Sequence, residues 1–393
     1  MLIGIDASRA TTARRTGTET YSLHLIRALI GLGTEHRFRL YIAQIPGFYE
    51  KPGIWGDSPE LRAIPFPRLW THVRLSADML TRPPDVLFVP AHVLPLIHPR
   101  RSVVTVHDLG YLHFPTAHRT VDRLYLDWST RWNAQQATAL LADSAATKAD
   151  LARAYRVDPA KVHVVYLGRD ETLAPVADPA ALAEMRERYG IAGRYLLYVG
   201  TLQPRKNLGR VIEAFAAIYQ DWGSGGLQLV LAGKRGWLYD DLFAQVDRLG
   251  LAGRVIFPGY IPDEDLPALL SGATAFVFPS LYEGFGIPVL EAGACGVPVI
   301  TSNTSSLPEV AGDAALLVDP HDVDAIAAAM YRLVTDDALR AELARRGQEN
   351  VKRFSWEKCA RETLAVILDA GSSKLDAGSS KLEVGSSKLE TQE

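Results

Sequence analysis

The sequence predicts an α/β protein made of two doubly wound domains, each with a parallel sheet. Short apolar runs alternate with helical periodicity along the chain, and this alternation occurs twice, on either side of residues 168–192. The length of 393 residues corresponds to two or three domains, and each half is long enough to bury a core. Because strands that alternate with helices form right-handed βαβ units, we expect two buried parallel sheets.

The expected strands and helices follow from this alternation. Strand-like apolar runs in the first half cover residues 2–5, 38–43, 86–89, 102–106 and 162–166. Those in the second half cover residues 195–199, 227–232, 255–257, 275–278, 297–301 and 315–318. Apolar residues recur at three- and four-residue steps, which is typical of amphipathic helices, over residues 19–30, 121–141 and 208–219.

Composition shifts give the expected domain boundaries. Residues 1–168 form the first domain and residues 191–354 the second, joined by a linker at 169–190 that is rich in proline, alanine and acidic residues. A terminal helix is expected over 355–368. Residues 369–393 repeat a Gly-Ser-Ser-Lys-Leu unit whose glycines oppose helix formation, so we expect a disordered tail without a catalytic role.

The overall composition excludes several classes of protein. Hydrophobic residues make up 48% of the chain, charged residues 22%, and the net charge is −3. These values argue against a disordered chain and against a dedicated nucleic-acid-binding protein. Cys295 and Cys359 are too few and too far apart for a disulfide scaffold or a zinc site, which predicts a reducing, cytoplasmic setting.

Contact with a membrane is expected to be peripheral if it occurs. The chain has no apolar run of about 18 residues that would span a bilayer, and its start resembles a strand more than a signal peptide. Core packing is the more common role of aromatic residues, but a basic, aromatic surface for a lipid-linked acceptor stays open. Its candidate residues are Trp70, Trp128, Trp132, Arg68, Arg123 and Arg131.

The most informative motif follows the strand-like run at 275–278. Glu283 and Glu291 lie on either side of the sequence Gly284-Phe285-Gly286, at the start of a predicted helix. Glycines let the backbone approach a ligand closely, and free N–H groups at a helix N-terminus attract anions. Carboxylates repel phosphate but bind hydroxyl groups, so a sugar phosphate or a nucleotide sugar fits better than bare phosphate. Alternatively, both acids are ordinary residues near a helix start.

A second motif follows the run at 195–199. Arg205 and Lys206 are expected at the carboxyl edge of the sheet, where open α/β folds bind ligands, and Asn207 is expected to cap the next helix. Two adjacent cations suit a diphosphate, although such pairs are also common on protein surfaces. The phosphate-binding sequences of ATPases and dinucleotide-binding proteins do not occur.

These motifs together resemble the retaining glycosyltransferases of family 4, which have the two-domain GT-B fold. The resemblance is strongest over residues 190–368 and includes segments 257–260, 292–300, 307–310 and 354–356. It implies that the C-terminal domain holds a nucleotide-diphospho-sugar donor and that the N-terminal domain binds the acceptor. It also implies no essential metal or other cofactor.

The resemblance assigns roles to individual residues. Glu291 would bind the donor ribose, Glu283 the hydroxyls of the transferred sugar, and Arg205 and Lys206 the diphosphate. The backbone at 285–286 would close over the diphosphate. Thr201 stands where the family often has arginine. The other donor-binding residues that the resemblance implies are Gly17, Tyr260, Gly284, Phe285, Gly286 and Leu290.

His107 follows the strand-like run at 102–106 and matches the family's active-site histidine. A lone histidine is more often structural, but one that faces a cleft can bond a sugar hydroxyl or transfer a proton. The neighbouring Asp108 would support the loop. The acidic run Asp263–Asp265 resembles a D-x-D metal signature of other glycosyltransferases, but it more plausibly begins a helix.

The expected enzyme is a retaining hexosyltransferase of polysaccharide biosynthesis. Its first candidate donor is GDP-mannose, and its acceptor is a glycan or a lipid-linked hydroxyl, with no nucleic-acid partner. The acceptor would attack on the side from which the diphosphate leaves, and the diphosphate would take its proton. A UDP-glucose-type glucosyltransferase, a nucleotide-sugar 2-epimerase of the same fold and a non-enzymatic sugar-nucleotide-binding subunit stay open. We expect a cytoplasmic location, with peripheral contact at the inner membrane face left open.

Overall fold

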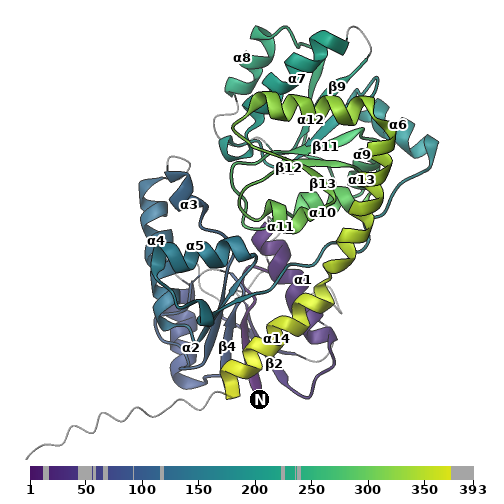
Figure 1. The fold of residues 1–393 in the computed structure, drawn as a ribbon. Helices are drawn as coiled ribbons and strands as arrows, with labels where there is room; N and C mark the ends of the chain where they lie inside the picture. Colours follow the sequence, from purple (N-terminus) through teal and green to yellow (C-terminus); the bar gives the residue numbers. More distant parts are fainter. Residues whose placement is uncertain are drawn as a thin grey trace, which may run out of the picture.

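The structure is a computed structural model that describes residues 1–11, 17–42, 55, 59–64, 70–91, 93–115, 119–222, 226–234, 236 and 240–372. It contains two domains, each with one parallel sheet and helices packed against it (Figure 1). The predicted fold class is therefore confirmed. The reason is local: strands such as 86–89 are continuous apolar runs, which a parallel sheet buries on both faces.

The N-terminal domain has a seven-stranded sheet in the order β3-β2-β1-β4-β5-β6-β7. Its strands are β1 (Leu2–Asp6), β2 (Arg37–Ile42), β3 (Glu60–Ala63), β4 (Val86–Val89), β5 (Ser102–Val106), β6 (Ala139–Ala142) and β7 (Val162–Val164). Its helices are α1 (Gly17–Gly31), the π-helical turn η1 (Thr71–Leu75), α2 (Ser76–Thr81), α3 (Gly110–His113), α4 (Thr120–Gln136), α5 (Ala145–Tyr155) and the 3₁₀ turn η3 (Pro159–Lys161).

The C-terminal domain has a six-stranded sheet in the order β10-β9-β8-β11-β12-β13. Its strands are β8 (Tyr195–Val199), β9 (Gln228–Ala232), β10 (Val255–Gly259), β11 (Ala275–Phe278), β12 (Val299–Ser302) and β13 (Ala315–Val318). Its helices are α6 (Pro179–Tyr189), η4 (Pro204–Lys206), α7 (Leu208–Trp222), α8 (Asp240–Arg248), α9 (Leu266–Ser271), α10 (Ile287–Ala294), α11 (Leu307–Ala311), α12 (Val323–Thr335), α13 (Asp337–Asn350) and η5 (Val351–Arg353).

The strand order reverses direction once in each sheet, and this reversal positions the site. In the N-terminal sheet the reversal lies between β1 and β4, and in the C-terminal sheet between β8 and β11. Chain connections leave in opposite directions at such a point, so a crevice opens beyond the carboxyl ends of the strands.

Two strands were not predicted, and one predicted helix is too long. The expected helix at 121–141 ends at Gln136, and its last residues form β6. A buried strand of four residues cannot be distinguished from a helix turn by periodicity alone. The edge strand β3, with the sequence Glu-Leu-Arg-Ala, is too polar and too short for a strand signal.

The predicted linker and tail differ from the observed elements. Helix α6 occupies 179–189 within the predicted linker, where Asp178 accepts a hydrogen bond from the N–H of Ala180 (3.0 Å). The terminal helix α14 (Trp356–Ser372) includes the first four residues of the predicted tail, and residues 373–393 lie outside the described residues.

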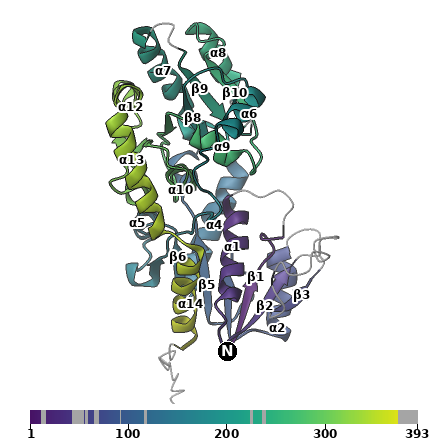
Figure 2. The same cartoon turned by 90° about the vertical axis from the view of Figure 1, so that its right-hand side faces the viewer.

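Helix α14 returns to the N-terminal domain instead of packing on the domain that precedes it (Figure 2). Its Trp356 stacks on His24 of α1, with ring centroids 5.2 Å apart. At its other end Gly371 lies against Met1 and Val86. The chain therefore links the two domains twice. Within the part of the chain that the structure describes, no helix is both long enough and apolar enough to cross a membrane.

Candidate active site

Two loops meet where the C-terminal sheet reverses its strand order. One follows β8 and contains η4, and the other joins β11 to α10; β8 and β11 are hydrogen-bonded neighbours. The N–H of Leu281 donates to the carbonyl of Arg205 (2.9 Å). The side chain of Asn207, expected as a helix cap, instead donates to the carbonyls of Pro279 (3.1 Å) and Pro320 (2.6 Å). These bonds fix the two loops relative to each other.

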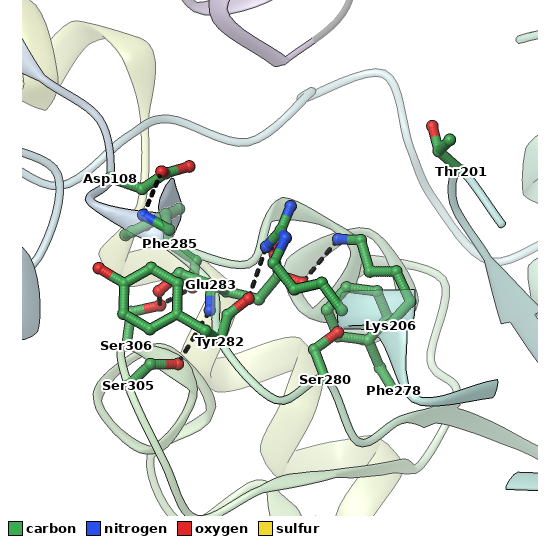
Figure 3. A network of polar contacts seen from close by, with 12 residues as sticks. Asp108, Thr201, Lys206, Phe278, Ser280, Tyr282, Glu283, Phe285, Ser305 and Ser306 are labelled. Atoms are coloured by element: carbon green, nitrogen blue, oxygen red, sulfur yellow. Dashed lines mark hydrogen bonds and ion pairs between the residues drawn. The ribbon is translucent and has the colours of Figure 1, made fainter. Parts of the chain in front are cut away.

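Three charged side chains form an ion cluster between these loops (Figure 3). Lys206 Nζ lies 2.6 Å from Oε1 of Glu283, and Arg205 Nη1 lies 2.9 Å from its Oε2. Lys206 and Glu283 are buried, and Nζ also lies 4.9 Å from the centre of the Phe278 ring. The structure therefore brings together three of the four predicted catalytic residues, although Arg205 and Glu283 are 78 positions apart.

The charges of this cluster are not balanced. Burial acts to raise the pKa of Glu283, but Lys206 and Arg205 outweigh it and hold that pKa below its ordinary value. Glu283 is therefore ionised, and its single negative charge faces two cations. The remaining positive charge favours an anionic ligand in the adjacent space.

Two serines that sequence reasoning missed hold the Glu283 loop. Ser305 Oγ accepts a hydrogen bond from the N–H of Glu283 (3.0 Å). Ser306 Oγ donates to the carbonyls of Glu283 (2.9 Å) and Phe285 (2.6 Å). The polar run at 302–306 is a turn signal, but it does not reveal which loop these hydroxyls contact.

The backbone before α10 requires glycine. Gly286 has φ of 114°, and a Cβ there would lie 2.8 Å from Cδ2 of Leu307. The Phe285 ring packs against Tyr166 and Phe354, with centroids 6.0 and 5.8 Å away. The positive end of the α10 dipole adds to the positive potential, although Pro288 has no N–H and the N–H of Val289 donates to the carbonyl of Gly286 (3.0 Å).

Glu291 lies one turn into α10. Burial, reinforced by Asp170 and Asp263, raises its pKa to about 7. It therefore changes charge near neutral pH, and its ionised form accepts hydrogen bonds from hydroxyl groups. The adjacent Leu290 is fully buried in the hydrophobic core and lines no part of the site. Its predicted donor contact therefore stays a prediction, and it could be made only by the backbone of Leu290 and not by its buried side chain.

His107, at the end of β5, has no ring nitrogen free for a substrate in this structure. Its Nδ1 lies 2.7 Å from Oδ2 of Asp143, and its Nε2 lies 2.9 Å from the carbonyl of Pro90. We assign both nitrogens as donors, since both partners are acceptors. Burial acts to lower the pKa of His107, but Asp143 outweighs it and the pKa is raised. The raised pKa favours the protonated ring that this pairing implies, and the expected hydroxyl contact or proton transfer requires one of these bonds to break. Asp108 accepts from the N–H of Gly110 (2.8 Å), which is loop support as expected.

A cleft of ≈ 520 Å³ lies between the two domains and is lined by residues of both. It brings together ten predicted residues: Gly17, His107, Thr201, Arg205, Lys206, Glu283, Gly284, Phe285, Gly286 and Glu291. Thr18, Thr20, Asp143 and Gln203 also line it and were not predicted.

A second cavity of ≈ 750 Å³ adjoins the cleft at Glu291, Ile287 and Thr20. Tyr260, the remaining predicted residue, lies here, with Lys234 Nζ 5.0 Å from its ring centre. Asp263 also lines this cavity. Asp265 instead pairs with Arg188 (2.8 Å) at the start of α9, so the two carboxylates of the D-x-D resemblance have different surroundings.

Two Rossmann-like domains that face each other across such a cleft form the GT-B architecture. The family "Glycosyl transferases group 1" matches residues 183–350, and "Glycosyltransferase Family 4" matches residues 15–173. The chain therefore belongs to the family 4 glycosyltransferases, and the resemblance that the motifs predicted is confirmed.

Relatives and solved structures agree with this assignment. An O-antigen chain mannosyltransferase B of Escherichia coli is 37% identical over 265 residues, 67% of this chain and 69% of that protein. An MMP alpha-(1->4)-mannosyltransferase of Mycolicibacterium hassiacum is 34% identical over 241 residues, 59% of this chain and 54% of that protein. Anabaena Alr3699/HepE in complex with UDP and glucose has the same fold, with a TM-score of 0.72 at 18% identity, over 93% of this chain and 99% of that chain.

Proposed function

We propose that the protein transfers a mannosyl group from GDP-mannose to an acceptor hydroxyl, with retention at the anomeric carbon. The observation that carries the proposal is the convergence of Arg205, Lys206, Glu283 and Glu291 on one cleft. Two cations and a helix N-terminus suit the diphosphate, and the two acids suit the hydroxyls of the sugar and the ribose. The mannosyltransferase relatives support mannose as the transferred sugar.

The state of Glu283 supports a retaining route that forms no covalent intermediate with this carboxylate. Both oxygens of Glu283 are paired with cations, at 2.6 and 2.9 Å, which makes this carboxylate a weak nucleophile. We propose that the bond between the anomeric carbon and the diphosphate oxygen breaks while the acceptor oxygen attacks from the same side. The acceptor proton passes to the departing diphosphate. Arg205 and Lys206 stabilise the charge that develops there, without a requirement for a metal or other cofactor.

The second cavity supports guanine as the donor base. Asp263 and Tyr260 line this cavity, which Glu291 joins to the cleft. Guanine presents two adjacent N–H donors that a carboxylate can accept, whereas the single N–H of uracil lies between two carbonyls that repel a carboxylate. The ring of Tyr260 offers a surface on which a base can stack.

A thermal-shift comparison of GDP, UDP and ADP tests the donor. At equal concentrations of the three nucleotides, we expect GDP to stabilise the protein most. At 100 times its Kd, GDP would raise the free energy of unfolding by about 2.7 kcal/mol. We expect Asp263→Asn to weaken GDP binding about tenfold or more, because a paired base contact contributes roughly 1–3 kcal/mol, and to leave UDP binding unchanged. Glu264→Gln, at the exposed neighbour that does not line the cavity, is the matched control. Stronger stabilisation by UDP would instead favour the UDP-glucose alternative.

Incubation of GDP-mannose without an acceptor separates transfer from epimerisation. A transferase gives slow hydrolysis to mannose and GDP, whereas a 2-epimerase converts the sugar while it stays attached to the nucleotide. Nuclear magnetic resonance of the transfer product then gives the anomeric configuration. An inverted product would contradict the retaining mechanism.

We also propose that the N-terminal domain contacts an anionic lipid surface that carries the acceptor. Val121, Leu124 and Trp128 lie on one face of α4 and are 76%, 60% and 41% exposed. Arg119 and Arg123 supply positive charge at the start of this helix, beside the acid Asp122. Arg131, also expected on this surface, is paired with Asp127 (2.9 Å). Trp70 and Trp132, expected to share this surface, pack against the core, and Arg68 lies outside the described residues.

Flotation with lipid vesicles tests this contact. We expect the protein to float with phosphatidylglycerol vesicles more than with phosphatidylcholine vesicles, and Leu124→Glu to abolish the difference. The control is Leu249→Glu, because Leu249 is 40% exposed on the C-terminal domain. Equal flotation of both variants would exclude α4 as the contact surface.

A further inference from the structure

The N-terminal domain contacts the residue directly before Glu283. Tyr282 belongs to the loop after β11, yet its ring stacks on His113 of α3, with centroids 4.4 Å apart. Its hydroxyl donates to Oδ2 of Asp150 (2.9 Å) and accepts from the N–H of Leu109 (3.3 Å). A side chain of the C-terminal domain is therefore held by groups 132 and 173 positions earlier in the sequence.

The groups that contact Tyr282 are held in place by further hydrogen bonds and ion pairs. Asp150, on α5, is buried and also accepts from Nε2 of His113 (3.1 Å) and from Arg153. Burial raises the pKa of Tyr282, and the Asp150 carboxylate raises it further. The phenol therefore stays neutral and donates a hydrogen bond to Asp150. The hydroxyl makes one bond as a donor and one as an acceptor, which fixes its position.

The position of Tyr282 is transmitted to the ion cluster through the backbone. The carbonyl of Tyr282 accepts a hydrogen bond from Nη1 of Arg205. The same nitrogen lies 2.9 Å from Oε2 of Glu283. A shift of Tyr282 would therefore displace both charged groups that line the cleft.

A second contact connects helix α5, which carries Asp150, to the segment that supports the Glu283 loop. The carboxylate of Glu309 accepts from the N–H groups of Ala145 (2.9 Å) and Ala146 (3.1 Å), at the N-terminus of α5. A negative charge at this end of a helix is favourable. Glu309 follows Ser306, which donates to the carbonyl of Glu283, by three positions. Helix α5 thus contacts residues that flank and support Glu283.

We propose that Tyr282 is a positioning residue that couples α5 to the arrangement of Arg205 and Glu283. The ion cluster takes its active geometry when the two domains are in contact through Tyr282 and Asp150. The proposal rests on the glycosyl transfer argued above, but it does not depend on which nucleotide carries the sugar.

The test compares Tyr282→Phe with Tyr195→Phe. The first variant removes the hydroxyl between the domains and keeps the ring on His113. The second removes an equally buried hydroxyl that donates to the carbonyl of Leu269 (2.7 Å) within the C-terminal domain. We expect Tyr282→Phe to lower kcat for hydrolysis of GDP-mannose about tenfold, or 1.4 kcal/mol, with less than a twofold change in KM. The control variant, Tyr195→Phe, should keep the wild-type kcat and KM.

The separation of the domains is measured independently by electron spin resonance without nucleotide. Spin labels at Ala77→Cys and Ala328→Cys, exposed sites on α2 and α12, report one distance between the domains; Cys295 and Cys359 are buried. We expect a broader distance distribution in Tyr282→Phe than in the wild type or the control. Asp150→Asn should have the same effect, and the double variant should add nothing further.

An unchanged distance distribution, or a loss of kcat equal to that in Tyr195→Phe, would overturn the proposal. Failure of the wild type to hydrolyse GDP-mannose would instead contradict the proposed donor, because the distance measurement does not use it.

Discussion

Lys206→Ala is expected to lower kcat by about 10²–10³-fold, the loss seen when one preorganised group that stabilises developing charge is removed. Lys206 is buried, and its ammonium lies 2.6 Å from Glu283 at the wall of the cleft. This cation is already in place when the diphosphate leaves, so no reorganisation is needed as negative charge develops. Steady-state kinetics with GDP-mannose measures the effect.

Two further variants make this result specific. Lys206→Met keeps the aliphatic stem near Phe278 and removes only the charge, so it should lose as much kcat as the alanine variant. Lys161→Ala removes a lysine whose ammonium donates to the carbonyl of Ala134 (2.7 Å) in the N-terminal domain, outside the cleft, and should keep kcat. A change confined to the KM of the acceptor would contradict the role assigned to Lys206.

Gly284→Ala is expected to lower kcat/KM about 10²-fold, because small displacements of catalytic groups cause losses of this size. A Cβ on residue 284 would lie 2.2 Å from the carbonyl oxygen of His107 and 2.8 Å from Cβ of Asp108. The first of these atoms is backbone and cannot rotate away. The variant must therefore move the Glu283 loop or separate the domains, while the core of each domain stays intact.

The matched control for this prediction is Gly31→Ala. A Cβ on residue 31, at the end of α1, has no atom within 4 Å, and alanine is the better helix former. Activity assays and thermal unfolding of both variants separate the effects. Wild-type kinetics in Gly284→Ala would mean that the close approach of His107 and Gly284 is not used in turnover.

These predictions share one feature of the structure. The cations and acids of the site belong to the C-terminal domain, but their surroundings come from both domains. The N-terminal domain contacts Tyr282 and Gly284, the two neighbours of Glu283 in the sequence. It also contacts Glu309, three positions after Ser306, which supports the Glu283 loop. Substitutions at these contacts should therefore impair turnover more than they destabilise either domain.

The fold class and the chemical character of the site could be predicted from the sequence because both rest on local patterns. Alternating apolar runs and helical periodicity require βαβ units, and the carboxyl ends of parallel strands meet at one edge of a sheet. Arg205, Lys206 and Glu283 lie five to seven positions after the ends of predicted strands, so their meeting at this edge could be expected. The resemblance to family 4 assigned the ribose to Glu291 and an active-site role to His107, which local patterns alone do not distinguish from a structural histidine.

The errors arose where the local signal was short. Strand β6 has four residues, fewer than are needed to separate a strand period from a helix period, so the helix before it was extended too far. The edge strand β3 was missed for a related reason, because its four residues are few and polar.

Residue order alone thus determined which charges this protein brings to the edge of its second sheet. Only the tertiary structure decided that Asp143 and Pro90 occupy both nitrogens of His107, that Ser305 and Ser306 hold the Glu283 loop, and that Tyr282 reaches α5. The physical reason is that periodicity reports which face of an element is buried. Contacts between side chains far apart in sequence depend on how whole domains pack against each other.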